Sequence, residues 1–186
     1  MAFSTKQKLF LSLCLAWSYH PIEWSNLYAS PGSRIKWKEN QAITWENFKG
    51  KIPEKSRLAA ETNSGIHFSY TCEGDKMSYN VYAYFDQDLS WKRKDAKPGI
   101  LNHERLHFDI SELYARKLRK KLLNLKHPCL LPKTELQKIF NDVVSDHKLK
   151  QKKYDLETNH SLDSLKQKYW ADWVEQELIV LKRYKN

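Results

Sequence analysis

The sequence predicts an α+β domain in which a small antiparallel sheet is followed by a helix with an HExxH motif and by further C-terminal helices. Two observations lead to this prediction. Apolar and polar residues alternate on both sides of a glycine-containing turn between residues 65 and 86, which is typical of a β-hairpin. From residue 100 onward, apolar residues recur at helical spacing. Strands first and helices afterwards indicate segregated α and β layers rather than βαβ units.

The length of 186 residues suits one compact domain with a buried core and is short for two. We assign residues 31–186 to this single domain. Lys6 and Lys8 precede a mostly apolar run over residues 9–17, which has the shape of a signal peptide and is shorter than the roughly 20 residues of a membrane span. We therefore interpret residues 1–30 as a signal peptide with an irregular lead-in; an amphipathic N-terminal helix is the alternative. The first interpretation predicts a secreted or periplasmic protein without a transmembrane segment.

The strands are expected in the first half of the domain. Residues 34–45 carry spaced Ile and Trp residues that suggest one or two short strands, and residues 58–62 fit either a helix or a strand. The hairpin is the clearest element. Its first arm alternates over residues 66–70, its turn lies at residues 73–75, and its second arm alternates over residues 77–85.

Three helices are expected in the second half. Residues 100–125 contain neither Gly nor Pro and carry an apolar stripe, and Pro128 follows their end. A second helix is predicted to open at Thr134, and residues 146–153 after its apolar stripe are highly polar. Ser161 is predicted to cap the last helix.

The chain is strongly basic, with a formal net charge of +10 and an isoelectric point near 9.4. Such a surface attracts anions, but charge by itself speaks for solubility and non-specific binding rather than for a particular function. We therefore expect no specific nucleic-acid partner.

The three cysteines lie too far apart in the sequence for a thiolate zinc site, because none of them forms a CxxC pair. Cys14 lies within the predicted signal peptide. If that segment is removed, Cys72 and Cys129 remain as an even pair, which suits a disulfide in an oxidising compartment. Two separate buried thiols are the equally open alternative.

The segment that suggests chemistry is His103-Glu104-Arg105-Leu106-His107, an HExxH motif. Four residues turn an α-helix by about 400°, so both imidazoles project from one face, one turn apart, and can bind one Zn²⁺. Glu104 lies about 100° around the helix, where it can stay off the metal and accept a proton from a zinc-activated water. The motif therefore predicts zinc ligation by His103 and His107, with Glu104 as the general base.

This motif is specific for a chain of this composition. With 7 histidines in the chain, a chance HExxH is expected about 0.02 times. The competing interpretation is a charged helix face that happens to carry two histidines.

A catalytic zinc site needs a third protein ligand and one open position. Residues 154–160 are the segment richest in ligand-type groups, and we expect them at the start of a helix. His160 is the predicted third ligand, with Asp155 and Glu157 as the next candidates.

The HExxH helix itself is a poor source of the third ligand. Asp109 and Glu112 are rotated by roughly 120–140° from His107, so they rank only as alternative ligands. Asp109 or Asp155 could instead orient a ligand imidazole through its second ring nitrogen. Tyr154 could donate to a developing oxyanion, although a plain structural role is the simpler interpretation for it.

Several segments together resemble a bacterial family, domain of unknown function 922, to which a secreted zinc-dependent protease activity is attributed. Residues 101–116, which include HExxH, are similar to its signature. Residues 43–50 resemble its N-terminal motif, residues 85–91 the segment before its zinc helix, and residues 154–160 its C-terminal motif. A Gly usually follows the last His of that motif, and Ser161 stands there in this chain.

The resemblance runs over residues 35–173 and implies a zincin-like metalloprotease domain. It supports His103, Glu104 and His107 as site residues and favours His160 as their partner. It says little about the substrate.

The sequence thus leads to two functional hypotheses. The first is a secreted zinc metallopeptidase, in which a zinc-activated water attacks the carbonyl of a peptide or protein substrate with Glu104 as general base. The alternative is a non-catalytic, zinc-stabilised module that binds envelope polymers or partner proteins through the basic surface and the seven tryptophans.

Overall fold

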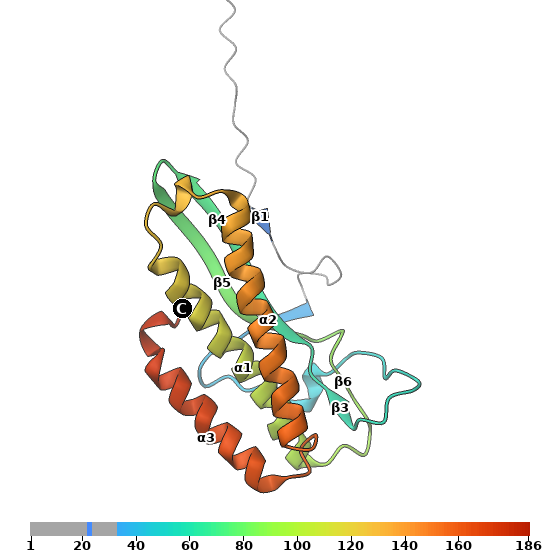
Figure 1. Ribbon diagram of the computed structural model, residues 1–186. Coiled ribbons are helices and arrows are strands. Elements are labelled where there is room, and N and C mark those ends of the chain that lie inside the picture. The colour runs from blue at the N-terminus through green and yellow to red at the C-terminus, as the bar shows by residue number, and fades with distance from the viewer. Residues whose placement is uncertain (1–21, 24–32) are drawn as a thin grey trace, which may run out of the picture.

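The computed structural model describes residues 22–23 and 33–186 (Figure 1). Most of the predicted signal peptide and lead-in lies outside these residues. The described part is a sheet packed against helices, as the predicted α+β class requires.

A four-stranded antiparallel sheet with strand order β1-β4-β5-β2 forms one layer. The predicted hairpin is confirmed: β4 (Ser64–Glu73) and β5 (Lys76–Asp86) pair along their whole length around Gly74, which has a positive φ of 56°. Strand β2 (Arg34–Lys36) pairs with β5. Strand β1 (Ile22–Glu23) pairs with β4, so two residues of the expected irregular lead-in are a short edge strand.

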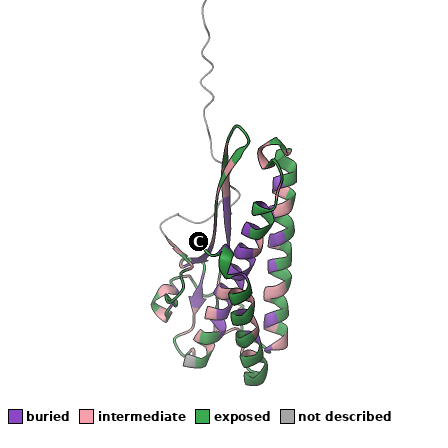
Figure 2. Cartoon of the chain, turned by 90° about the vertical axis from the view of Figure 1, so that its left-hand side faces the viewer, coloured by how far each residue is buried: buried purple, intermediate pink, exposed green. Residues whose placement is uncertain are grey.

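The register of the hairpin places its large apolar residues on one face. Ile66 lies opposite Ala83, and Phe68 lies opposite Val81. All four are at most 4% exposed, because the helices cover this face (Figure 2). The period of two in the sequence therefore marks the side of the sheet that faces the core.

A second, two-stranded sheet lies beside the first. It joins β3 (Ala60–Glu61) to β6 (Trp91–Lys92) and resolves the ambiguity of residues 58–62 in favour of a strand. The indole of Trp91 donates to Glu61 at 3.0 Å. After β2, the expected further strand is replaced by a 3₁₀ turn at Trp45–Asn47.

Three long helices form the other layer: α1 (Pro98–Leu123), α2 (Lys133–Glu157) and α3 (Ser164–Val180). Short 3₁₀ turns at Pro128–Leu130 and Lys182–Tyr184 follow α1 and α3. Helix α1 contacts the sheet as well as both other helices. None of the helices in the described ranges combines the length and the apolar composition that a membrane span requires.

Two predictions about the C-terminal half are wrong. Residues 154–160 do not lie at the start of a helix: α2 runs through the polar residues 146–153, so Asp155 lies near its end. The reason is a buried stripe that continues at helical spacing through His147 to Tyr154. Helix α3 is capped by Asp163, whose side chain accepts from the Lys166 amide, and not by Ser161.

A disulfide joins Cys72, near the end of β4, to Cys129 in the turn between α1 and α2. The two Cα atoms are 5.8 Å apart. The bond ties the outer end of the hairpin to the connection between the first two helices.

Replacing both Cys72 and Cys129 by Ser should lower the free energy of unfolding. The sequence separation of the cysteines is 57 residues, and opening a loop of that length costs about 4 kcal/mol. Urea denaturation would measure the loss. The wild-type protein in reductant should match the double variant, and equal stability of all three samples would contradict a structural disulfide.

Three successive residues between α2 and α3 have left-handed backbone conformations. The φ angles are 48° for Asn159, 51° for His160 and 75° for Ser161. Each L-residue in this region costs roughly 1–2 kcal/mol, with Asn the most tolerant. Backbone hydrogen bonds from His160 to Asp155 and from Asp163 to Thr158, both 2.9 Å long, hold the turn.

The substitution Ser161→Gly should raise the free energy of unfolding by about 1 kcal/mol, because glycine adopts a positive φ without the Cβ penalty. Differential scanning calorimetry would show the higher Tm. Asn159→Gly is the matched control and should change Tm less. A lower Tm for Ser161→Gly would contradict this account of the turn.

Candidate metal centre

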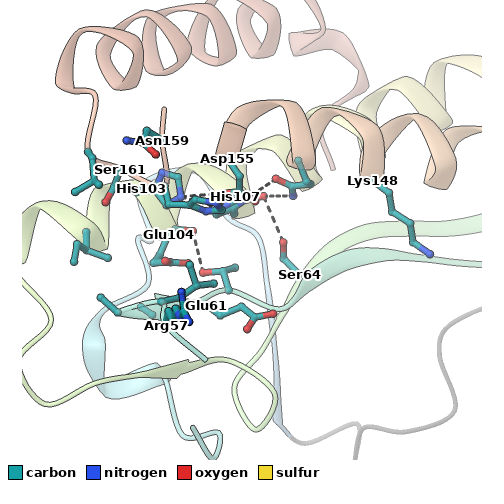
Figure 3. Close-up of a pocket in the computed structure, with 18 of the residues that line it drawn as sticks. Arg57, Glu61, Ser64, His103, Glu104, His107, Lys148, Asp155, Asn159 and Ser161 are labelled. Atoms are coloured by element: carbon teal, nitrogen blue, oxygen red, sulfur yellow. Dashed lines mark hydrogen bonds and ion pairs between the residues drawn. The ribbon is translucent and has the colours of Figure 1, made fainter. Parts of the chain in front are cut away.

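The two histidines of the HExxH motif lie side by side on the buried face of α1 (Figure 3). His103 is 4% exposed and His107 is 9% exposed. Their Nε2 atoms are 3.2 Å apart. One helical turn between the two residues produces this pairing, as the i, i+4 spacing predicts.

Asp155 of α2 completes a triangle with the two imidazoles. Its Oδ1 atom lies 3.1 Å from Nε2 of His103 and 3.0 Å from Nε2 of His107. Among the described residues, these three form the cluster whose donor atoms could hold a metal ion. The sequence ranked His160 ahead of Asp155, whereas the structure brings Asp155 to the two imidazoles, because α2 continues far enough to carry this residue over α1.

The second ring nitrogen of each histidine faces a glutamine amide oxygen. Nδ1 of His103 is 3.0 Å from Oε1 of Gln167, and Nδ1 of His107 is 2.7 Å from Oε1 of Gln151. The Gln151 amide nitrogen donates to the backbone carbonyl of His107 at 2.8 Å, which fixes the orientation of this amide. Both Nδ1 atoms therefore act as donors, and both Nε2 atoms direct lone pairs at Asp155.

Sequence reasoning missed both glutamines. Gln151 precedes Asp155 by one helical turn, so a helix assigned through residue 155 would have indicated it. Gln167 lies on α3, and no spacing in the sequence relates it to the histidines.

Three acceptors that converge in a buried site require a positive charge between them. In the absence of metal, a proton can serve. Burial alone would lower the pKa of His107, but hydrogen bonding and attraction to Asp155 outweigh it and raise this pKa. Burial alone would raise the pKa of Asp155, but the two imidazoles hold it well below its usual range.

The residues also fit a metal. Ligand atoms at 2.0–2.1 Å from a tetrahedral Zn²⁺ are about 3.3 Å apart, close to the 3.0–3.2 Å edges of the triangle. Glu104 is 3% exposed, and its Oε2 atom has no hydrogen-bond partner in the described part of the chain. Such a buried carboxylate oxygen needs a partner of its own, which a water beside a metal would provide.

The cluster opens into a cavity of about 540 Å³. Helices α1 and α2 line it on one side, and residues 57–64, which include β3, line it on the other. Glu104 lies between the two histidines and the segment that carries Arg57 and Glu61 (Figure 3). The site is therefore accessible to a ligand from the side of the small sheet.

Tyr154 lies beneath the site rather than in the cavity. It is fully buried, and its ring stacks on His103 with a centroid distance of 4.5 Å. Its hydroxyl accepts from the Gln167 amide at 2.5 Å and donates to the His103 carbonyl at 3.3 Å. These contacts support the structural role for Tyr154, and they leave no access to an oxyanion.

Three other candidate ligands are engaged elsewhere. The indole of Trp37 donates to Asp109 at 2.7 Å, and burial raises the pKa of this carboxyl to about 6. Glu157 accepts from the Trp170 indole at 2.9 Å.

Glu112 is the third of them. It is 2% exposed, and its two oxygens accept from Arg119 at 3.1 and 3.2 Å. The Nε atom of Arg116 adds a contact of 2.9 Å. The structure thus does not bring Asp109, Glu112 and Glu157 together with the two histidines, because each makes its hydrogen bonds elsewhere.

His160 lines the cavity but stands outside the triangle. Its Nδ1 atom is 3.9 Å from Oδ1 of Asp155, and its side chain is 50% exposed. The chain leaves α2 before this residue, so the left-handed turn and not the helix determines its position.

Comparison with known proteins identifies a family. A family model described as a bacterial protein of unknown function, DUF922, matches residues 51–161, which is more than half of the chain. The matched segment contains all three residues of the triangle and Glu104. No curated protein and no solved structure matches the chain. The chain belongs to the DUF922 family of bacterial proteins of unknown function.

Proposed function

We propose that this protein is a zinc-dependent hydrolase that cleaves peptide bonds. The triangle of His103, His107 and Asp155 beside the unpartnered carboxylate of Glu104 is the observation on which the proposal rests. Two imidazoles and one carboxylate leave a tetrahedral metal one open position, as a catalytic site requires.

A bound zinc ion would supply a Lewis acid that polarises a carbonyl and lowers the pKa of a water molecule to about 7. His103, His107 and Asp155 would hold the ion. Glu104 accepts the proton of the attacking water and passes it on to the leaving amine. Its burial and its free Oε2 atom suit this role, because no other described group competes for that oxygen.

The surrounding residues hold the ligands in place. Gln151 and Gln167 fix the imidazole tautomers, since each accepts the Nδ1 proton. The ring of Tyr154 packs against His103 and limits its rotation. Partners of this kind typically change metal affinity by roughly 10–100-fold when removed.

An extended peptide fits the cavity better than a compact substrate. Strand β3 lines the cavity and pairs with β6 along one edge. The Ala59 carbonyl accepts from the Arg93 amide at 2.7 Å. Successive residues of an antiparallel strand direct their N–H and C=O groups to opposite sides, so those of Ala60 point away from β6. We propose that the backbone of an extended substrate pairs with these groups.

We also propose that the protein acts outside the cytoplasm. The Cys72–Cys129 disulfide supports this location, because such bonds persist in oxidising compartments. The predicted signal peptide would provide the route.

Asp155→Ala should abolish stoichiometric metal binding, because it removes one of three ligands. Inductively coupled plasma mass spectrometry of the purified proteins would test this, with zinc and iron both measured, since two histidines and one carboxylate can also hold Fe(II). Asp146→Asn, an exposed carboxylate on the same helix, is the matched control and should retain the metal. A wild-type protein that stays metal-free after reconstitution would refute the proposal.

Glu104→Gln should keep zinc and lower kcat for peptide hydrolysis by about 10²–10⁴-fold, because a neutral amide cannot accept the proton. Cleavage of a fluorogenic casein digest would measure the rate, and metal analysis would confirm loading. Glu61→Gln, at the exposed side of the same cavity, should retain most activity. Full activity in Glu104→Gln would disprove the mechanism. If no zinc-loaded sample, including the wild type, cleaves peptides, the non-catalytic binding module is favoured.

A further inference from the structure

His160 lines the cavity, and its imidazole has no evident structural role among the described residues. Its ring reaches within 3.9 Å of Asp155, yet it makes no hydrogen bond to any other described side chain. Half of the side chain remains exposed, in contrast to the buried His103 and His107. The residue therefore faces the space where a substrate would lie.

The backbone of His160 adopts an unfavourable, left-handed conformation with a φ of 51°. Its neighbours Asn159 and Ser161, which Figure 3 shows on the same side of the cluster, share its left-handed conformation. Left-handed conformations are unfavourable for residues that carry a Cβ atom. The His160 amide also donates to the backbone carbonyl of Asp155, which couples the turn to a ligand residue. Backbone strain of this kind occurs preferentially at functional sites.

His160 does not belong to the group of described ligand atoms that all lie within 4.8 Å of one another. Pairs within the triangle are 3.0–3.2 Å apart, whereas Nδ1 of His160 is 3.9 Å from Oδ1 of Asp155. Its distance suits a group beside the open position instead.

Two hydroxyl donors near the cluster are already engaged. The hydroxyl of Tyr154 is buried under His103. The hydroxyl of Thr62 donates to the Glu104 carbonyl at 3.2 Å. An N–H group of His160 remains for a substrate oxygen.

We propose that His160 is a catalytic residue that donates a hydrogen bond to the carbonyl oxygen of the scissile peptide bond, an inference that rests on the proposed hydrolase function. The bond strengthens as negative charge develops on that oxygen while water attacks the carbonyl carbon. His160 thus acts on the substrate and not on the metal.

The test compares zinc affinity, ligand binding and turnover in His160→Ala. Chelator competition should show zinc affinity close to that of the wild type, far from the roughly 10–100-fold loss that follows removal of even a ligand-orienting group. Acetohydroxamate, a carbonyl-containing zinc ligand, should bind about tenfold more weakly by titration calorimetry. The kcat for casein peptides should fall by about 10²–10³-fold with little change in KM.

Two further variants distinguish the loss of the hydrogen-bond donor from a change in the fold. His160→Asn keeps an N–H donor on a residue that tolerates the left-handed conformation, so it should recover part of the lost kcat. His127→Ala is the matched control: His127 is exposed, has a φ of 47° and lies outside the cavity, so its removal should leave all three measurements unchanged.

Failure of the proposed function and failure of the inference on His160 give different results. A wild-type protein without zinc would overturn the proposed function and this inference with it. Zinc binding that is lost only in His160→Ala would make His160 a ligand and overturn this inference alone. Unchanged hydroxamate affinity in His160→Ala would also overturn it.

Discussion

The burial of polar side chains on α1 is the constraint on which the rest of the structure depends. This helix contacts the sheet, α2 and α3, so polar groups on several of its faces are removed from water. Each of them needs a partner, because an unpaired buried polar group costs free energy. Towards the C-terminal end of α1, Glu112 finds its partners within the protein, in Arg116 and Arg119. At the other end, His103 and His107 meet a carboxylate, and the three acceptors need a cation.

The two clusters on α1 differ in whether their charged groups find partners within the protein. The Glu112 cluster is complete in itself and anchors α1 to β5 and to the C-terminal segment, through Arg119 contacts to Val81 and Tyr184. The histidine cluster is complete only with a proton or a metal, and it opens into the cavity. Charged groups in the first cluster hold the fold together, whereas those in the second line the cavity.

The elements with strong local patterns were predictable. The hairpin follows from alternation around Gly74, and α1 follows from an uninterrupted helical stripe that ends within two residues of the predicted boundary. The turn between α2 and α3 was not predictable. Polar residues 146–153 hid the continuation of α2, because the stripe there consists of His147, Gln151 and Tyr154 rather than aliphatic residues. The ranking of His160 over Asp155 rested in part on that misplaced helix boundary, and in part on the family resemblance.

The sequence by itself determined the pair of histidines and the glutamate, because a spacing of four residues on one helix defines their geometry locally. Only the tertiary structure decided what completes the site. Asp155 and Gln151 come from α2 and Gln167 comes from α3, so their approach to α1 depends on how three helices pack. Packing depends on contacts between residues that lie more than 40 positions apart in the chain, and no local spacing encodes a distance of that kind.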